Sequence, residues 1–444
     1  MTSAIIAMAS VMAILTGAIH MLAVLKRRFL DNPEIIRKLL HLSMGTLALS
    51  FPWVFDSVWP VVTLSIIASL FISLVKVSNL LEWRPVLCAS GRRSIGEICF
   101  PLSIGLLFLL SGGDKLTYLI PVAILTYADS ASALIGQRFG AHAFETNGGA
   151  KSAEGSLAFL LTSFTCAFAS LHLLIPGAGL AQSLLLAFIL ALLAMMLEAV
   201  SWNGLDNFLI PVGTYYALTT HLPLAIDELV VRAFILSVLA AFMIGGRRRT
   251  TLDGGAILGA VLFAYFSWVM GGLIWMVIPV SLFISYRFLL PQRYRESRGI
   301  HSVYGVVSVV SAGVMWLLVA NQKAAPEYIF PYALAFAAHA AIISIAHLRS
   351  HKLDKPRTYA LLFAVLKAWC LICLPLVFLQ PTLQMVLLSF FLAPFCIAIP
   401  TFLFFRGNQR SLAHDARLER RRWLRQALYG AIASALGLIP LLMR

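Results

Sequence analysis

One aspartate lies inside a long apolar stretch of the sequence, where a charge is unusual. Asp129 stands within the run 116–135, whose other residues are mostly aliphatic, aromatic or small. An ionised carboxylate inside a membrane costs a few kcal/mol or more unless a cation or a cavity receives it, so such residues are usually functional. A carboxylate kept only for structure is the alternative. Gly136 and Gly140, spaced as GxxxG, would let a second helix approach closely.

A second group of polar residues precedes another apolar run. Glu34, Arg37, Lys38 and His41 are separated by spacings that place all four on one face of a helix, at the edge of the membrane. We expect this face to take part in a site shared with the other polar groups. As an alternative, Arg37 and Lys38 are ordinary basic residues flanking a span, and Glu34 is their partner on the helix.

The segment 91–97 combines basic residues with glycines directly before an apolar run. It contains Arg93, Ser94 and Glu97. Arginine side chains and the backbone N–H groups of a helix start together favour phosphate binding. A basic turn followed by a glutamate that complements the helix dipole is the alternative.

A glycine-rich segment, 147–156, runs into the next apolar stretch and also has the elements of a phosphate site. It carries Lys151, Ser152, Glu154 and Gly155, although its spacing differs from the GxxxxGK[ST] phosphate loop. Glu154, three residues after Lys151, would face the same way and hold Mg²⁺. The alternative is a capped helix start with a salt-bridged lysine.

The fifth group flanks a short loop between two apolar runs. Glu198 ends one run, and Asp206 with Asn207 begins the next. Because Mg²⁺ prefers a few carboxylates together with substrate phosphates, Asp129, Glu154, Asp206 and Asn207 are the candidate metal ligands. A turn formed by Asp-Asn before a proline-containing span is the alternative.

The composition identifies the environment of these groups. Of 444 residues, 60% are hydrophobic and 12% are charged, which lies far outside the soluble range. The apolar runs are continuous rather than alternating, which disfavours a β-barrel. The sequence predicts an all-α, polytopic transmembrane helix bundle of about 15–16 spans in two halves, 1–245 and 246–444. The runs are 4–25, 39–55, 58–75, 98–110, 116–135, 157–175, 184–200, 208–218, 229–244, 256–270, 273–284, 303–320, 329–345, 361–379, 383–405 and 424–442.

The distribution of Lys and Arg predicts which side of the membrane carries the motifs. The net charge of +15 comes from short basic clusters beside spans, and these clusters fall on alternate loops. The positive-inside rule places such loops, with all five polar groups, on the cytosolic side and both termini outside. A nucleic-acid partner is excluded because it would need a soluble basic surface. We therefore expect the five groups to form one site at the inner face.

The motifs together resemble the phytol kinase and dolichol kinase family, which includes a CTP-dependent diacylglycerol kinase. The resemblance covers about residues 30–220. The matching motifs are Glu34-x-x-Arg37-Lys38-x-x-His41, Arg93-Ser94-x-Gly96-Glu97, Ala128-Asp129, Lys151-Ser152-x-Glu154-Gly155-Ser156, and Glu198 with Leu205-Asp206-Asn207.

The resemblance implies a Mg²⁺-dependent transfer of the γ-phosphate of CTP, or another nucleoside triphosphate, to a long-chain alcohol such as phytol, dolichol or diacylglycerol. Asp129, Lys151 and Glu154 would be catalytic. Mg²⁺ would be held by Glu154, Asp206, Asn207 and Asp129, the last of which would alternatively orient the lipid hydroxyl. The residues implied to bind the nucleotide are Glu34, Arg37, Lys38, His41, Arg93, Ser94, Glu97, Lys151, Ser152 and Gly155.

The second half matches less well. Its start, 249–256, faintly resembles the phytyl-phosphate kinase family, but Ala338-His339 stands where that family would have Ala-Asp. Residues 246–444 are therefore a degenerate paralogue or an unrelated membrane module. Two other functions remain open for the whole chain, a lipid-phosphate cytidylyltransferase and a multi-span transporter. Transporters place their polar breaks near the midplane, whereas here these breaks gather at the cytosolic ends.

Overall fold

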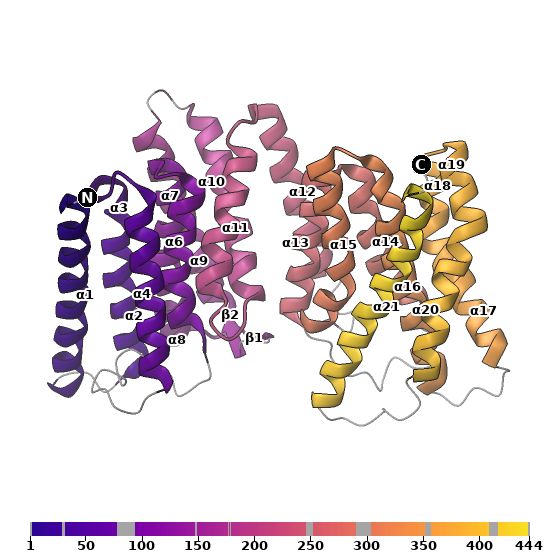
Figure 1. The fold of residues 1–444 in the computed structure, drawn as a ribbon, viewed down its shortest axis with the longest axis horizontal. Helices are drawn as coiled ribbons and strands as arrows, with labels where there is room; N and C mark the ends of the chain where they lie inside the picture. Colours follow the sequence, from indigo (N-terminus) through magenta and orange to yellow (C-terminus); the bar gives the residue numbers. More distant parts are fainter. Residues whose placement is uncertain are drawn as a thin grey trace. The chain divides into compact units, whose positions relative to one another are not determined.

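The chain folds as a helical membrane protein of two compact units (Figure 1). The computed structural model describes residues 2–28, 32–77, 94–146, 149–175, 177, 179–245, 252–289, 303–350, 357–407 and 416–442. Unit 1 comprises Met1–Ser237 and unit 2 comprises Val238–Arg444. The predicted all-α polytopic architecture is confirmed. The division between the units falls within α12 (Ile226–Gly245), a few residues before the boundary expected from the sequence.

Unit 1 is built around two buried helices, the long helix that carries Asp129 and the helix α10, both packed against α9. Its elements are α1 (Thr2–Arg28), α2 (Pro33–Leu49), α3 (Phe51–Val54), α4 (Val58–Val77), α6 (Gly96–Ser111), α7 (Lys115–Ala123), η1 (Ile124–Ala128), α8 (Asp129–Phe139), β1 (Ala143–Thr146), β2 (Gly149–Ser152), α9 (Ala153–Leu174), α10 (Leu180–Val200) and α11 (Asp206–His221), followed by the start of α12.

Unit 2 surrounds one central helix, α16, whose neighbours are α14, α15, α17, α20 and α21. Its elements after α12 are α13 (Gly254–Gly271), α14 (Leu273–Leu289), α15 (Val303–Lys323), η4 (Pro326–Tyr328), α16 (Ile329–Ser350), α17 (Arg357–Ala368), η5 (Trp369–Cys373), α18 (Leu374–Leu379), α19 (Leu383–Leu387), η6 (Leu388–Leu392), α20 (Ala393–Gly407) and α21 (Ala416–Leu442).

All sixteen apolar runs of the sequence fall in helices. Eleven helices of the described chain are long and apolar enough to cross a membrane. The other five runs fall in α2, α6, α11, α12 and α14. Four of these helices have only 16 or 17 residues, short of the roughly 20 that a full span needs, and α12 carries Asp227 and Glu228 in its first turn.

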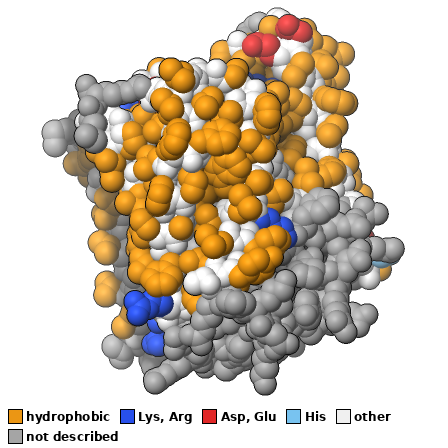
Figure 2. Space-filling view, turned by 90° about the vertical axis from the view of Figure 1, so that its right-hand side faces the viewer, with side chains coloured by type: hydrophobic (Ala, Val, Ile, Leu, Met, Phe, Trp, Pro, Cys, Tyr) orange, Lys and Arg blue, Asp and Glu red, His pale blue; other side chains and the backbone are white. Residues whose placement is uncertain are grey.

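The outer surface of the helices is apolar. Figure 2 shows one face on which hydrophobic side chains cover most of the described surface, with a few Lys and Arg side chains among them and Asp and Glu side chains at the top. Large exposed side chains such as Leu362, Phe378 and Phe391 would be unfavourable in water. The chain is therefore an integral membrane protein with lipid as the solvent for these side chains.

The helix that carries Asp129 departs from regular α-helical geometry directly before that residue. η1 is a π-helical turn between α7 and α8, so the helix is continuous from Lys115 to Phe139 but wider over five residues. Such turns shift the hydrogen-bonding pattern and often occur at functional sites. Here His41 of α2 donates from Nε2 to the carbonyl of Leu125, within the π-helical turn, at 3.0 Å.

The segment predicted as a glycine-rich turn contains a small β-hairpin. Strands β1 and β2 pair antiparallel, with Ala143 opposite Ser152 and Thr146 opposite Gly149. The hairpin leads directly into α9, and Ser152 caps that helix by accepting a hydrogen bond from the Gly155 N–H at 3.1 Å. Lys151 is thus positioned by a strand instead of a loop.

Glycines permit the close helix packing that the GxxxG spacing predicts. A Cβ atom on Gly136 would lie 3.1 Å from Ser152 Oγ and 3.5 Å from Gly155 Cα, and one on Gly155 would lie 3.0 Å from the Ser132 carbonyl oxygen. The backbones of α8 and α9 therefore approach closely. This contact holds the Asp129 helix beside the hairpin.

Replacing Gly45 by Ala is expected to lower the melting temperature of the protein in detergent. A Cβ at Gly45 would overlap the Thr126 side chain, at the contact between α2 and η1. Overpacking of this kind destabilises a protein by about 1–3 kcal/mol. Gly17→Ala is the matched control, because a Cβ on this other helical glycine would meet no atom within 4 Å. Equal melting temperatures for the two variants would contradict the packing described here.

Candidate functional site

The centre of the candidate site is a buried ion pair between two helices. Lys38 Nζ of α2 lies 2.5 Å from Asp129 Oδ2 at the start of α8, and also donates to the Asp129 carbonyl oxygen at 3.2 Å. The two side chains are only 3% and 8% exposed. An unpaired charge at this depth would be strongly unfavourable, so each of the two charges stabilises the other in its buried position.

His41 completes this centre, one helical turn after Lys38. Its Nε2 lies 3.5 Å from Asp129 Oδ2, in addition to its hydrogen bond with the Leu125 carbonyl. Since a carbonyl oxygen only accepts, Nε2 carries the proton in this arrangement. The His41 ring also packs edge-on against Phe100, with ring centroids 4.8 Å apart. Lys38 and His41 thus meet Asp129 on one face of α2, the face that the spacing predicts.

Glu34 and Arg37 form a second ion pair at the start of α2. Arg37 Nε donates to Glu34 Oε2 at 3.0 Å, and its Nη2 contacts the other carboxylate oxygen. Burial acts to raise the pKa of Glu34, but the hydrogen bond and charge of Arg37 outweigh it, and the pKa lies below its usual value. The charges of Asp129 and Asp206 also act on Arg37. Arg37 is therefore a further cation at the end of α2 that carries Lys38.

Lys151 reaches a carboxylate at the end of α10. Its Nζ lies 2.7 Å from Glu198 Oε1 and also donates to the Glu198 carbonyl oxygen. Glu198 is 6% exposed, and its second carboxylate oxygen, Oε2, is buried with no hydrogen-bond partner among the described residues. The charges of Asp129 and Asp206 act on Glu198 as well. A buried carboxylate oxygen without a donor is a position that a cation would satisfy.

Glu154 and Lys151 contact different partners, although the sequence predicts that the two face the same way. His142 Nδ1 lies 2.6 Å from Glu154 Oε1, and the backbone N–H of His142 approaches both carboxylate oxygens at 3.3 Å. This pair ties the start of β1 to the start of α9. The structure therefore gives Glu154 a partner in the hairpin, whereas Lys151 pairs with Glu198.

The residues around the start of α6 bind one another across three elements. Lys76, at the end of α4, lies 2.9 Å from Glu97 Oε2 and donates to the Ser94 carbonyl oxygen. The Ile95 N–H donates to the Asn203 carbonyl oxygen at 2.8 Å. Arg93, the remaining predicted phosphate ligand of this segment, lies outside the described residues.

The loop before α11 packs on that same segment. Asn207 is buried and donates from Nδ2 to the Gly96 carbonyl oxygen at 3.0 Å. Gly204, with φ at +86°, lies so close to Gly96 that a Cβ there would overlap the Gly96 backbone. Asp206 is the first residue of α11, and its charge acts on Arg37, Glu198 and Cys99. This loop thus places Asp206 where its charge influences Arg37 and Glu198.

These contacts bring together most of the predicted residues, but not all in the predicted roles. The described residues contain no group of three or more His, Cys, Asp or Glu side chains close enough to hold a metal ion in this arrangement. Of the candidate Mg²⁺ ligands, Asp129 and Asp206 share an electrostatic environment with Glu198, while Glu154 is engaged by His142. Asp129, Asp206 and Glu198 are thus linked by electrostatic interaction, and Glu198 Oε2 has no hydrogen-bond partner among the described residues.

Three residues of this network have no role assigned from the sequence. Glu198 was singled out with the loop that follows it, and the signal that marks it is the same as for Asp129, a carboxylate within an apolar run. Lys76 is one more basic residue at the end of a span. His142 becomes recognisable only when the hairpin brings it to Glu154.

Comparison with known proteins places this constellation in a family. No family model and no solved structure matches the chain. A phytol kinase of Synechocystis sp. is 32% identical to it over 202 residues, which is 45% of this chain and 84% of the relative. Since the match covers most of the relative at this identity, and the motif residues converge at one end of unit 1, the chain belongs to the phytol kinase family.

Proposed function

We propose that the chain is a Mg²⁺-dependent lipid kinase that transfers the γ-phosphate of CTP, or another nucleoside triphosphate, to a long-chain lipid alcohol. Phytol, a polyprenol such as dolichol, and diacylglycerol are the acceptors that this proposal includes. Unit 1 carries the reaction. The membership of the chain in the phytol kinase family supports kinase chemistry on a lipid, and the site supplies the groups that such chemistry needs.

The observation that carries the proposal is the meeting of three cations and three carboxylates at one end of unit 1. Arg37, Lys38 and Lys151 are the cations, from α2 and β2. The carboxylates Asp129, Glu198 and Asp206 come from α8, α10 and α11, and act on these cations or on one another. Phosphoryl transfer depends mainly on positioning and on neutralisation of charge, and this combination can provide both.

The proposed roles follow from these contacts. Lys151 and Arg37 neutralise the phosphate oxygens of the nucleotide, with Arg93 as a further candidate. Lys38 and His41 hold the carboxylate of Asp129, which orients the lipid hydroxyl for in-line attack on the γ-phosphorus. A new bond forms between the hydroxyl oxygen and that phosphorus while the bond from phosphorus to the β–γ bridging oxygen breaks; the nucleoside diphosphate leaves with that oxygen, and the hydroxyl proton is released to solvent.

The divalent ion has candidate ligands in the same place. Asp129, Glu198 and Asp206 would hold it, and Glu198 Oε2 has no other partner among the described residues. When bound, Mg²⁺ would neutralise charge on the β- and γ-phosphates. Asn207, a candidate ligand from the sequence, joins α11 to α6 through its amide nitrogen and positions Asp206 beside it. Glu154 has an indirect role, because its ion pair with His142 holds in place the hairpin that carries Lys151.

The active site is proposed to face the cytosol, where the nucleotide is available. The basis is the excess of Lys and Arg in the loops at this end of the spans. In sealed vesicles of known orientation, CTP added outside is expected to support phosphorylation only when the cytosolic face is exposed. Equal activity from vesicles of both orientations would contradict this sidedness.

Radiolabel transfer by the purified full-length protein tests the reaction. Label from the γ position of CTP or ATP is expected to enter at least one of phytol, dolichol and diacylglycerol, and to be lost when EDTA removes Mg²⁺. Label arriving from the α position of CTP would instead identify a cytidylyltransferase. Absence of label in every lipid would favour transport, and the kinase proposal would be abandoned.

A further inference from the structure

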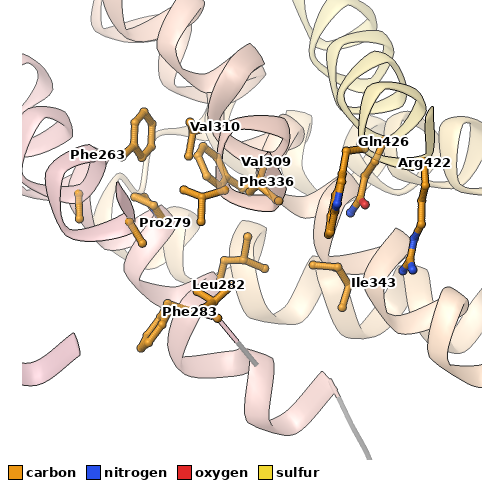
Figure 3. Close-up of a pocket in the computed structure, with 16 residues that line it drawn as sticks. Phe263, Pro279, Leu282, Phe283, Val309, Val310, Phe336, Ile343, Arg422 and Gln426 are labelled. Carbon is orange, nitrogen blue, oxygen red and sulfur yellow. The ribbon is translucent and has the colours of Figure 1, made fainter. Parts of the chain in front are cut away.

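Unit 2 contains a cavity that the proposed reaction does not use. It has a volume of about 110 Å³ and is lined by α13, α14, α15, α16 and α21. Phe263, Leu282, Val309 and Phe336 contribute apolar side chains from four of these helices (Figure 3). Empty apolar space loses dispersion contacts along its whole lining, so a cavity of this kind is stabilised by an apolar occupant.

One end of the cavity is polar, and both of its polar side chains come from α21. Figure 3 shows Gln426 and Arg422 side by side, with the labelled apolar side chains of the other helices across from them. Gln426 is 1% exposed, and its Nε2 is buried with no hydrogen-bond acceptor among the described residues. Arg422 is half-buried, and its guanidinium lies 5.6 Å from the centre of the Trp423 ring.

These two side chains define what the occupant must carry. An amide N–H buried without an acceptor is unfavourable, and a ligand oxygen would satisfy it. A guanidinium one turn away prefers an anionic oxygen and makes charge-assisted hydrogen bonds to it. The polar end therefore selects an oxyanion, such as a phosphate monoester or a carboxylate.

The size of the cavity limits the apolar part of the occupant. An apolar cavity of roughly 150 Å³ binds a molecule of about the size of benzene. A space of about 110 Å³ therefore accommodates only the first few carbons of one hydrocarbon chain, and not two acyl chains side by side. The cavity lies among helices that span the membrane, so the surrounding lipid is the available source of a hydrocarbon chain.

We propose that unit 2 binds a single-chain amphiphile with an anionic headgroup, whose first few chain carbons occupy the cavity between α13 and α16 and whose headgroup oxygens contact Gln426 and Arg422. The site lies wholly within unit 2, and its existence does not depend on the reaction proposed for unit 1. A phosphate monoester and a carboxylate share the required chemistry, and the experiment distinguishes them.

Photo-crosslinking of the purified full-length protein with a diazirine-bearing hexadecyl monophosphate tests the site. Saturable labelling is expected on peptides of α15 and α21. Hexadecyl monophosphate or palmitate is expected to compete at least tenfold better than hexadecanol, and their relative strength identifies the preferred oxyanion. Dipalmitoyl phosphatidate, which has two chains, is expected to compete poorly. Equal competition by hexadecanol, or strong competition by phosphatidate, would overturn the proposal without the need for any variant.

Three variants locate the site. Val309→Trp fills the cavity and is expected to abolish the labelling, whereas Val314→Trp, at an exposed position on the same helix, is expected to leave it unchanged. Gln426→Leu keeps a similar volume but removes the donor, and is expected to weaken binding of the monophosphate about tenfold. Each variant is first shown to elute as a folded species in size-exclusion chromatography. Labelling that persists in folded Val309→Trp would place the ligand elsewhere and refute the site.

Discussion

Replacing Asp129 by Asn is expected to lower the rate of lipid phosphorylation by about three orders of magnitude or more. The substitution keeps the size of the side chain but removes the negative charge that Lys38 and His41 hold in place. A charge positioned at the reacting atoms contributes about 10²–10³ in rate, and a lost metal ligand adds to this. Radiolabel transfer from γ-labelled CTP to the accepted alcohol measures the effect.

Loss of activity in Asp129→Asn must be distinguished from loss of folding. The variant leaves Lys38 buried without a counter-charge, which destabilises a protein by about 3–5 kcal/mol. Adding Lys38→Met removes that charge, so the double variant is expected to regain most of the melting temperature but none of the activity. Asp114→Asn is the matched control, because it caps α7 of the same long helix at an exposed position and asparagine also caps helices. Recovery of activity in the double variant would assign a structural role to Asp129.

Replacing Lys151 by Met is expected to reduce kcat/KM for the nucleotide about ten- to a hundredfold. The ammonium group is the cation that the hairpin presents beside Glu198, and a charged donor to phosphate contributes roughly 1.5–3 kcal/mol or more. Because the nucleotide is the group that Lys151 contacts in the proposal, KM for CTP should rise while KM for the alcohol changes little. Initial rates measured over both substrate concentrations separate these parameters.

Two further variants interpret that result. Lys115→Met removes an exposed lysine at the start of α7 and is expected to leave both KM values unchanged. Lys151→Met alone leaves the Glu198 charge unpaired, whereas Lys151→Met combined with Glu198→Gln removes both charges of the pair. The double variant is therefore expected to have a higher melting temperature than Lys151→Met, while its activity stays low. A nucleotide KM that does not change in folded Lys151→Met would remove this residue from the phosphate site.

The sequence was sufficient for the helical architecture and for identifying the residues at the centre of the candidate site, but it assigned Lys38 and His41 to the nucleotide and did not predict that they contact Asp129. Asp129 is recognisable because a charge in an apolar run requires a partner, and the spacing of Lys38 and His41 places both on the helix face where that partner lies. The glycine spacing after Asp129 likewise predicted a close helix contact, which α9 provides. In each case a local rule, either helical periodicity or the avoidance of unpaired charge in lipid, determines the outcome.

The pairing of the other charges could not be read from the sequence, because it depends on the hairpin. Lys151 and Glu154 are three residues apart, which in a helix would align them, but the chain changes from strand to helix between them. Their side chains therefore find different partners, Glu198 and His142. A short hairpin with few strand-forming residues gives little periodic signal, and the pairing is set by contacts that are distant in sequence.

The π-helical turn before Asp129 makes the geometry of the site sensitive to the number of residues in that helix. In an α-helix each residue adds a rotation of about 100°. The π-helical turn accommodates one residue more than an α-helical turn, so if the same residues closed into ordinary α-helix, Asp129 would be carried about a quarter of a revolution around the axis, away from α2. The extra residue in this turn therefore fixes the direction in which the carboxylate points.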